Sequence, residues 1–236
     1  MTRRRWIADE CTADTAALLG QNAAHLARVL RARVGDLYDI ACGDQLRLGT
    51  ISSVSDERVE FTLGDVVAVT EELRPITILM AIYKFDRMEW AIEKCTELGA
   101  ARIVPVIARR TDAHLALASS KRVERWRRIA HEAAQQSRGT GAPAISDPCQ
   151  LAAALATEAP LRLLLNENER AKKISEIFSA DASGVAIAVG PEGGWTSEEL
   201  AQFDAAGWQS VTLGSRILRA ETAAIAALAV AAALAG

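Results

Sequence analysis

The chain has 236 residues, of which 50% are hydrophobic and 24% are charged, and its formal net charge is −3. This length allows one large domain or two unequal ones, and the composition is that of a folded globular protein, not a disordered or fibrous chain. The slightly acidic balance argues against general affinity for nucleic acids, so any such affinity must come from local clusters of charge.

The N-terminus carries three arginines, Arg3, Arg4 and Arg5, but acidic residues follow from Asp9 onward, where a secretory signal would be apolar. The only long apolar run, residues 223–235, is mostly alanine and is shorter than the ~20 residues that span a bilayer. We therefore expect a cytoplasmic protein without a membrane segment.

The first part of the chain reads as β-rich. Short strands are predicted at residues 37–41, 45–52 and 58–63, because turn signals such as Gly-Asp and Ser-Asp separate them. A helix is predicted at residues 21–31, from apolar residues at helical spacing. These elements fit a small β-barrel with one inserted helix over residues 1–72, followed by a charged linker that ends at Pro75.

After Pro75 the pattern alternates between strands and helices. Strands of mainly apolar residues are predicted at residues 76–83, 103–107, 161–165, 185–189 and 210–213. Helices are predicted from a cap at Asp86 to Gly99, over residues 121–136, and over residues 221–234. Pro105 indicates an edge or irregular position in its strand. The pattern predicts an α/β domain with a mainly parallel sheet over residues 75–236.

The cysteines and histidines predict neither a disulfide nor a metal site. The four cysteines are scattered, without a C-x-x-C pair, so we expect four reduced thiols: Cys11, Cys42, Cys95 and Cys149. The three histidines lie far apart, and no metalloprotease, serine hydrolase or Walker motif occurs.

Basic residues gather in two places. Residues 1–33 carry a local excess of three positive charges, and residues 121–128 carry an excess of four. Either cluster by itself is more often a solvated surface than a binding site. Because both occur on a mildly acidic protein, two interpretations stay about equally open: a local binding site for a polyanion, and a solvated helix face.

Three segments with chemical character follow predicted strands: residues 166–169, 190–194 and 214–222. Ligands of parallel sheets bind at the carboxyl ends of the strands, so we expect these segments to meet. In the loop Gly190-Pro191-Glu192-Gly193-Gly194 the three glycines have no Cβ atom, so a ligand can contact the backbone directly, and Pro191 makes the loop more rigid. Thr196 and Glu199 then form a capping box for the next helix.

The loop has two interpretations. Without a P-loop lysine or a G-x-G-x-x-G motif it suits a flat heterocycle better than a phosphate, yet a tight structural turn explains its spacing equally well. In the third segment Arg216 and Arg219 are suited to phosphate, and Glu221 is favourably placed at a helix start. A salt-bridged helix start explains Glu221 but not the two arginines.

The order of motifs along nearly the whole chain resembles that of the RsmE family. The first part of the resemblance rests on Arg3-Arg4-Arg5-Trp6, His25, Val29-Leu30-Arg31 and Gly35-Asp36. It continues through Lys84, Lys94–Gly99, Ile103, Pro105, Glu132–Ser137, Gly190–Gly194 and Leu213–Ala223. Members of this family are bacterial 16S ribosomal RNA uridine N3-methyltransferases that use S-adenosylmethionine.

The resemblance implies a fold that the residue patterns could not predict. It implies a PUA-like RNA-binding β-barrel over residues 1–72 and a SPOUT-type, trefoil-knotted parallel-sheet domain over residues 75–236. Knots are otherwise almost absent from proteins. It also implies a homodimer, a small-ribosomal-subunit substrate and no metal ion.

The resemblance further implies which residues form the site. The methyl donor would be bound by Leu165, Asn166, Glu167, Gly190, Pro191, Glu192, Gly193, Gly194, Leu213, Gly214, Ile217 and Leu218. Our own hypothesis adds that Arg219 and Glu221 act at the reacting base, with Glu221 orienting the site or helping to remove the N3 proton. RNA would be bound by Arg3, Arg4, Arg5, Arg28, Arg31, Arg138 and Arg216.

One departure from the family pattern affects RNA binding. Members often carry an arginine where this chain has Gly139, and Arg138 comes one residue earlier. Two rival functions also stay open: a non-catalytic RNA-binding assembly factor, and an enzyme of the same class that methylates a ribose 2′-hydroxyl or transfer RNA.

Overall fold

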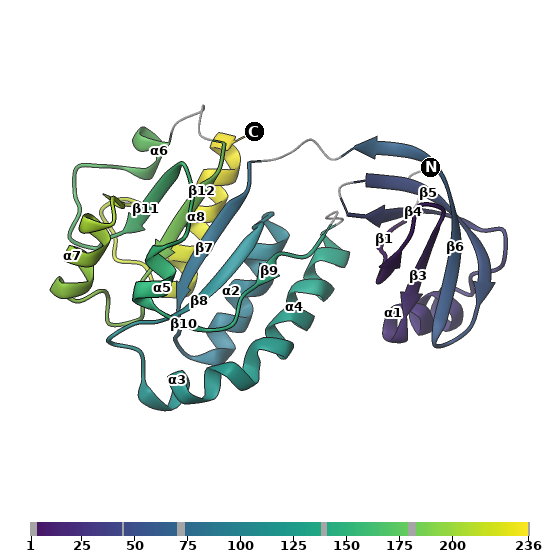
Figure 1. Ribbon diagram of the computed structural model, residues 1–236, viewed down its shortest axis with the longest axis horizontal. Helices are drawn as coiled ribbons and strands as arrows, with labels where there is room; N and C mark the ends of the chain where they lie inside the picture. The colour runs from purple at the N-terminus through teal and green to yellow at the C-terminus, as the bar shows by residue number, and fades with distance from the viewer. Residues whose placement is uncertain (1–3, 44, 70–73, 138–140, 179–182, 236) are drawn as a thin grey trace. The chain divides into compact units, whose positions relative to one another are not determined.

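The computed structural model describes residues 4–43, 45–69, 74–137, 141–178 and 183–235 (Figure 1). The chain divides into two compact units: Met1–Glu71 with Ala134–Gly141, and Glu72–Ala133 with Ala142–Gly236. Each unit has its own hydrophobic core, so each is considered by itself.

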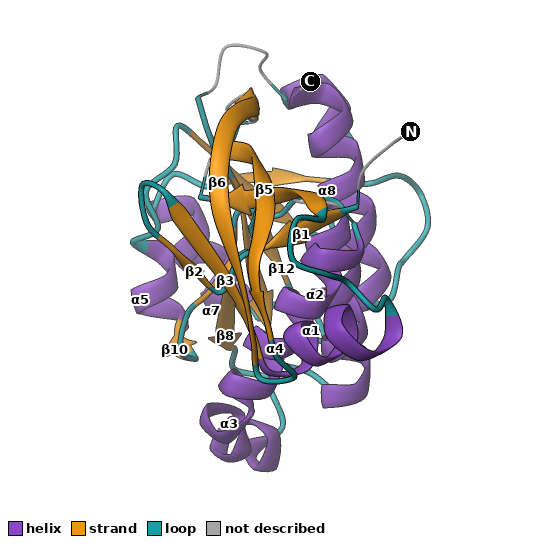
Figure 2. Ribbon diagram, turned by 90° about the vertical axis from the view of Figure 1, so that its right-hand side faces the viewer, coloured by secondary structure: helices purple, strands orange, loops and turns teal. Residues whose placement is uncertain are grey.

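The first unit is a six-stranded mixed sheet with one short helical segment. In chain order its elements are β1 Arg5–Ile7, β2 Glu10–Cys11, β3 Thr15–Leu19, α1 Gly20–Ala24, a π-helical turn His25–Val29, β4 Leu37–Cys42, β5 Gln45–Val54 and β6 Arg58–Val69. The strand order is β1-β4-β5-β6-β3-β2, and only the β1–β4 pair is parallel. The long strands β5 and β6 curve across this unit (Figure 2).

This sheet curls until its two edges meet. Its edge strands, β1 and β2, are separated by only two residues, which cannot cross the width of a flat six-stranded sheet. The amide of Ala8 donates to Ala41 O of β4, and that of Asp9 donates to Ala17 O of β3, so adjacent residues bond to opposite edges. The predicted inserted helix is present but changes from α to π geometry at His25.

The prediction of four reduced thiols was wrong for two of the cysteines. Cys11 of β2 and Cys42 of β4 form a disulfide, with their Cα atoms 6.0 Å apart. The two strands are far apart in strand order, and only the curling of the sheet brings them together, so their spacing in the sequence carried no sign of the bond. Cys95 is a buried free thiol and Cys149 a half-buried one.

The second unit is a parallel α/β sheet with helices on both faces. Its strands are β7 Ile76–Ala81, β8 Arg102–Ile107, β9 Ala144–Ile145, β10 Cys149–Gln150, β11 Leu161–Leu165, β12 Val185–Val189 and β13 Gln209–Val211. Its helices are α2 Phe85–Glu97, α3 Ala113–Ser119, a 3₁₀ turn Ser120–Arg122, α4 Val123–Gln136, α5 Leu151–Leu155, α6 Ile174–Ile177, α7 Ser197–Ala205 and α8 Ala220–Ala235.

The strand order is β10-β8-β7-β12-β11-β13, with β9 paired to β8, and every pair is parallel. Alternate residues of the central strands enter two separate cores, as expected for strands that are covered on both faces. One core includes Ile78 and Met80 and packs against α2, α4 and α8; the other includes Leu79 and Ala81 and packs against α5 and α7. Figure 1 shows these helices distributed over the sheet.

Most strand and helix predictions for this unit are confirmed, and the strands at 161–165 and 185–189 have the predicted bounds. The predicted cap at Asp86 was wrong. The helix begins one residue earlier, after Lys84, and Asp86 lies within its first turn. Pro105 lies inside the sheet, at the gap where the neighbouring partner of β8 changes from β9 to β10.

Candidate functional site

The three strand-end segments predicted to meet line one pocket of about 460 Å³. They follow β11, β12 and β13, and β12, β11 and β13 are neighbours in the parallel sheet, so their carboxyl ends lie at the same edge. All but one of the predicted donor-binding residues line it: Leu165, Asn166, Glu167, Gly190, Pro191, Glu192, Gly194, Leu213, Gly214, Ile217 and Leu218. The exception is Gly193, whose carbonyl accepts a hydrogen bond from Arg110 and which is not a lining residue.

The glycine-rich loop is a tight turn whose inner surface has no room for side chains. The amide of Gly194 donates to Pro191 O at 2.9 Å, and Gly194 has a φ of +71°, in the left-handed region that favours glycine. A Cβ atom at Gly194 would lie 2.7 Å from Glu167 Oε1, and one at Gly190 would lie 3.0 Å from Trp195 Nε1. The loop is therefore a tight structural turn, as one of the two interpretations has it, and its backbone also lines the pocket.

The predicted capping box is confirmed and holds the loop to the sheet. Thr196 Oγ1 accepts from the amide of Glu199, and Glu199 Oε2 accepts from the amide of Thr196 at 2.8 Å. Glu199 is 5% exposed, and its other oxygen accepts from the amide of Arg109, beyond the end of β8. The start of α7 is thus tied both to the glycine-rich loop and to a neighbouring strand end.

The segments after β11 and β13 are held to each other by hydrogen bonds. The amide of Asn166 donates to Val211 O at 3.1 Å, and the side chain of Asn166 donates to Ser210 Oγ at 3.2 Å. Thr212 Oγ1 accepts from the amide of Gly214 and donates to its carbonyl. The backbone of the pocket is therefore ordered, whereas Arg216, Ile217, Leu218 and Arg219 are exposed at it.

Several lining residues were not selected from the sequence: Lys84, Arg87, Asn168, Arg170, Val189, Trp195, Val211, Thr212, Ala220 and Ala223. Lys84 and Arg87 come from a fourth strand end, after β7. Because β7 pairs directly with β12, the start of α2 reaches the glycine-rich loop. The sequence did show basic residues soon after an apolar strand. It could not show that this strand lies beside β12, because strand order cannot be derived from sequence periodicity.

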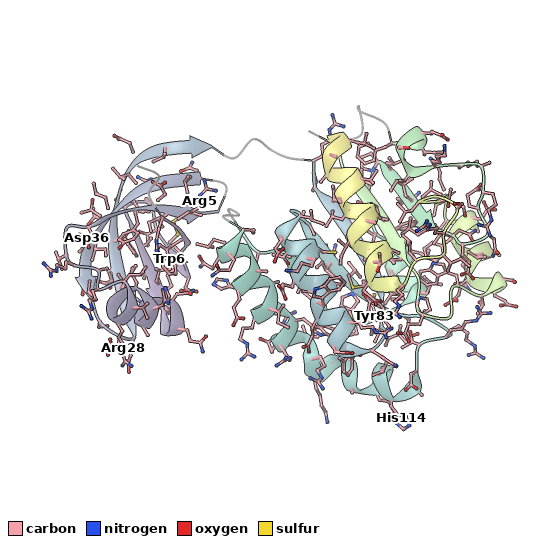
Figure 3. The ribbon with its side chains drawn as sticks, turned by 180° about the vertical axis from the view of Figure 1, so that it is seen from behind. Arg5, Trp6, Arg28, Asp36, Tyr83 and His114 are labelled. Carbon is pink, nitrogen blue, oxygen red and sulfur yellow. A yellow bond between two sulfur atoms is a disulfide. The ribbon has the colours of Figure 1, made fainter. Side chains whose placement is uncertain are left out.

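Glu221 is not among the residues that line the pocket. It lies in the first turn of α8 and is 5% exposed, and its Oε1 is 3.9 Å from Arg87 Nε. Its Oε2 is buried and has no hydrogen-bond partner among the described residues. Figure 3 shows Tyr83 near this end of α8, and burial, with further contributions from Cys95 and the carboxylates of Glu221 and Glu192, raises the pKa of Tyr83 well above its ordinary value.

The predicted RNA-binding arginines that the structure describes are divided between the two units. Arg4, Arg28 and Arg31 are exposed on the first unit and Arg5 is half-buried there, but Arg28 is paired with Asp56 at 2.7 Å. Arg216 lies at the pocket of the second unit. The remaining two, Arg3 and Arg138, lie outside the described residues.

The basic cluster at residues 121–128 is largely neutralised by acidic neighbours. Arg125 makes two hydrogen bonds to Glu89 at 2.7 and 2.8 Å, and Arg127 pairs with Glu124 and Asp147. These contacts favour the solvated-helix-face interpretation of this cluster.

No group of three or more metal-binding side chains is found in the described part of the chain. None of the helices in that part is both long and apolar enough to cross a membrane.

Comparison with known proteins identifies the family. Residues 70–232 match the family model of an RNA methyltransferase domain. The chain is 33% identical over 228 residues to the ribosomal RNA small subunit methyltransferase E of Bacillus subtilis, covering 92% of this chain and 89% of that protein. It is 34% identical over 215 residues to the protein of the same name from Synechocystis, covering 87% and 68% of the two chains.

Solved structures agree with this assignment. The crystal structure of the Neisseria gonorrhoeae ribosomal RNA small subunit methyltransferase E bound to S-adenosyl methionine matches with a TM-score of 0.82 at 31% identity, covering 96% of this chain and 95% of that one. A Legionella pneumophila protein in complex with the same cofactor matches with a TM-score of 0.84 at 28% identity, covering 99% and 98%. The chain therefore belongs to the RsmE family of ribosomal RNA small subunit methyltransferases.

Proposed function

We propose that this protein transfers a methyl group from S-adenosylmethionine to N3 of one specific uridine in the 16S ribosomal RNA of the small subunit. The observation that carries this proposal is the pocket formed by three strand-end segments around a bare glycine-rich turn. It occurs in a chain whose relatives are named for small-subunit RNA methylation and include a structure bound to S-adenosyl methionine.

The residues of the pocket fit this donor. Its volume of about 460 Å³ lies within the usual range for small-molecule sites. Gly190 and Gly194 are part of the lining and carry no side chain, so a flat adenine would lie directly against the backbone, and Leu213, Ile217 and Leu218 offer apolar contact. When bound, S-adenosylmethionine supplies an electrophilic methyl group carried on a sulfonium.

The protein's contribution is to align the acceptor base and to favour loss of its N3 proton. Arg219 and Arg216 are exposed at the pocket, where guanidinium groups can hold RNA phosphate or a base edge. Glu221 is buried outside the lining, so its role in this proposal is to orient the site and not to touch the base. Arg138, next to Gly139, remains a candidate RNA contact.

The first unit is proposed to be a PUA-like RNA-binding domain, with Arg3, Arg4, Arg5, Arg28 and Arg31 as its RNA contacts. Its curled sheet and exposed arginines support this role. The amide of Ile174 donates to Thr212 O, the amide of Thr212 donates to Lys172 O, and α8 packs against β7 and β12. A SPOUT-type trefoil knot is proposed from these contacts between segments that are far apart in the chain.

A homodimer is proposed from the outer side of α8. Apolar side chains there, including Ile225 and Val230, are only half-buried within one chain, and Leu234 is 39% exposed. A cytoplasmic location is proposed because the substrate named for the relatives is ribosomal RNA.

The function is tested with small subunits from a strain that lacks the enzyme. Incubation with S-adenosylmethionine and the full chain should add one N3-methyluridine to 16S RNA, as mapped by mass spectrometry of RNA fragments. A 2′-O-methyl product, or methylation of transfer RNA instead, would overturn the proposed target. If calorimetry detected no heat of S-adenosylmethionine binding and no competition by this donor, the result would favour the rival function of a non-catalytic assembly factor.

A further inference from the structure

Arg87 stands between two carboxylates at the wall of the pocket. It lies in the first turn of α2, and its side chain is 32% exposed and lines the pocket. Its Nη1 donates to Glu192 Oε1 of the glycine-rich loop at 2.7 Å, and its Nε is 3.9 Å from Glu221 Oε1 at the start of α8. One guanidinium thus joins elements from three separate parts of the chain.

The buried carboxylate of Glu221 holds the guanidinium of Arg87 on one side. A buried carboxylate is unfavourable unless a cation or hydrogen-bond donors compensate it, and Glu221 Oε2 has no hydrogen-bond partner among the described residues. The nearby cation is Arg87. A guanidinium has five N–H groups, and with Nη1 and Nε facing carboxylates, Nη2 is left for a third acceptor.

The other cationic side chains that line the pocket are Lys84, Arg170, Arg216 and Arg219. Among the described residues, no ion pair holds any of these four in the way that Glu192 and Glu221 hold Arg87. The hydroxyl of the buried Tyr83 donates to Met80 Sδ at 3.5 Å, so it is directed into the core.

We infer that Arg87 contacts the acceptor uracil and stabilises the negative charge that develops on a ring carbonyl oxygen as N3 loses its proton. Glu192 and Glu221 are positioning residues that hold the guanidinium from two sides. The inference rests on the proposed function and adds a residue to it.

The reaction balances without a further reagent. The N3–H bond breaks and its proton passes to water. The electron pair on N3 forms the new N–CH₃ bond, and the electrons of the broken C–S bond remain on sulfur. The guanidinium changes no bond: it donates a hydrogen bond to O2 or O4, where the charge of the N3 anion is delocalised, and acts as a preorganised donor.

The test compares Arg87→Gln and Arg87→Lys with wild type, using the full chain, enzyme-deficient small subunits and saturating S-adenosylmethionine. For Arg87→Gln we expect the single-turnover rate to fall about 100-fold, as for loss of one oxyanion donor. We also expect its rate to keep rising with pH beyond the point where the wild-type rate levels, because the N3 anion has lost its stabilising charge. Arg87→Lys, which keeps the charge, should restore part of the rate.

Glu221→Gln tests the positioning role. It should shift the pH profile in the same direction as Arg87→Gln but by less, since the guanidinium remains. Arg125→Gln, which removes a comparable arginine–glutamate pair outside the pocket, is the matched control and should leave rate, pH profile and thermal midpoint close to wild type.

The outcomes separate this inference from the proposed function. If wild-type protein forms no N3-methyluridine, the proposed function fails. If wild type is active but Arg87→Gln keeps its rate and pH profile, the role of Arg87 is wrong. If Arg87→Gln only weakens S-adenosylmethionine binding, measured by calorimetry, or if both Arg87 variants melt early, Arg87 is a structural tie between α2 and the loop and the inference is overturned.

Discussion

Gly194 illustrates how much of the site depends on single residues. Its φ of +71° excludes most side chains, and a Cβ atom there would lie 2.7 Å from Glu167 Oε1, which also lines the pocket. A side chain at this position would therefore strain the turn and displace a pocket residue together.

Gly194→Ala should weaken S-adenosylmethionine binding about tenfold or more, since strain and displacement together amount to roughly 1.4 kcal/mol. Gly99→Ala is the matched control: Gly99 has a φ of +86°, but a Cβ atom there would meet nothing within 4 Å. Calorimetry on both variants checks this, and equal affinities would contradict the role of the loop.

Cys95 shows the effect of burial on a titratable group. Desolvation raises the pKa of its thiol from 9.0 to about 12. In the unfolded chain the thiol ionises from about pH 9, whereas in the folded protein it stays protonated. The stabilisation from this raised pKa is thus complete below pH 9 and is lost as the pH rises toward 12.

We therefore expect the free energy of unfolding to fall over this alkaline range, with Tyr83 acting in the same direction. Urea unfolding at a series of pH values checks the fall. Cys95→Ala should be less stable at neutral pH, because it leaves a cavity, but should show a shallower alkaline decline. An equally steep decline would show that Cys95 is not its source.

At the scale of elements, one covalent bond joins the two meeting edges of the curled sheet in the first unit, in addition to the hydrogen bonds of Ala8 and Asp9. Strand β2 has two residues and pairs only with β3 among the described strands, yet the Cys11–Cys42 disulfide joins it to β4 across the meeting edges. The two cysteines are separated by 31 positions in the sequence, and the bond closes the loop between them.

Removing this bond with Cys11→Ser and Cys42→Ser should lower the unfolding free energy of the first unit by about 3.5 kcal/mol, from the chain entropy of a loop this long. Hydrogen exchange resolved by segment measures the effect in β1 to β6. Cys149→Ser, in the second unit, is the control and should leave exchange in β1 to β6 unchanged. If the double variant kept the same protection from hydrogen exchange in the first unit, the meeting edges of the sheet would be held by their hydrogen bonds alone.

On the scale of the whole molecule, the two units should respond differently to the methyl donor. The proposed donor pocket is lined only by residues of the second unit. At a concentration 100 times its Kd, S-adenosylmethionine should raise the unfolding free energy of that unit by about 2.7 kcal/mol. Calorimetric scans with and without the donor check this, and Gly194→Ala should reduce the shift. Equal stabilisation of the first unit would contradict a pocket confined to the second.

The sequence predicted local structure well wherever packing and periodicity agree. Strand 185–189 was found with its bounds because a strand covered on both faces is apolar throughout, and strand 161–165 was found because only Arg162 interrupts its apolar run. The capping box of Thr196 and Glu199 was found because its partners are three residues apart. Eleven of the twelve residues that the family resemblance implies as donor-binding line the pocket, and they belong to segments that the strand pattern had already placed at strand ends.

What the sequence alone determined, then, is the α/β character of the second unit and the identity of the three loops at its strand ends. Tertiary structure alone decided that β7 lies beside β12 and brings Arg87 to Glu192, that Glu221 is buried outside the pocket lining, and that Cys11 reaches Cys42. The physical reason is range. Hydrogen bonding and side-chain periodicity act over a few residues, whereas strand order and sheet curling arise from packing between segments far apart in the chain.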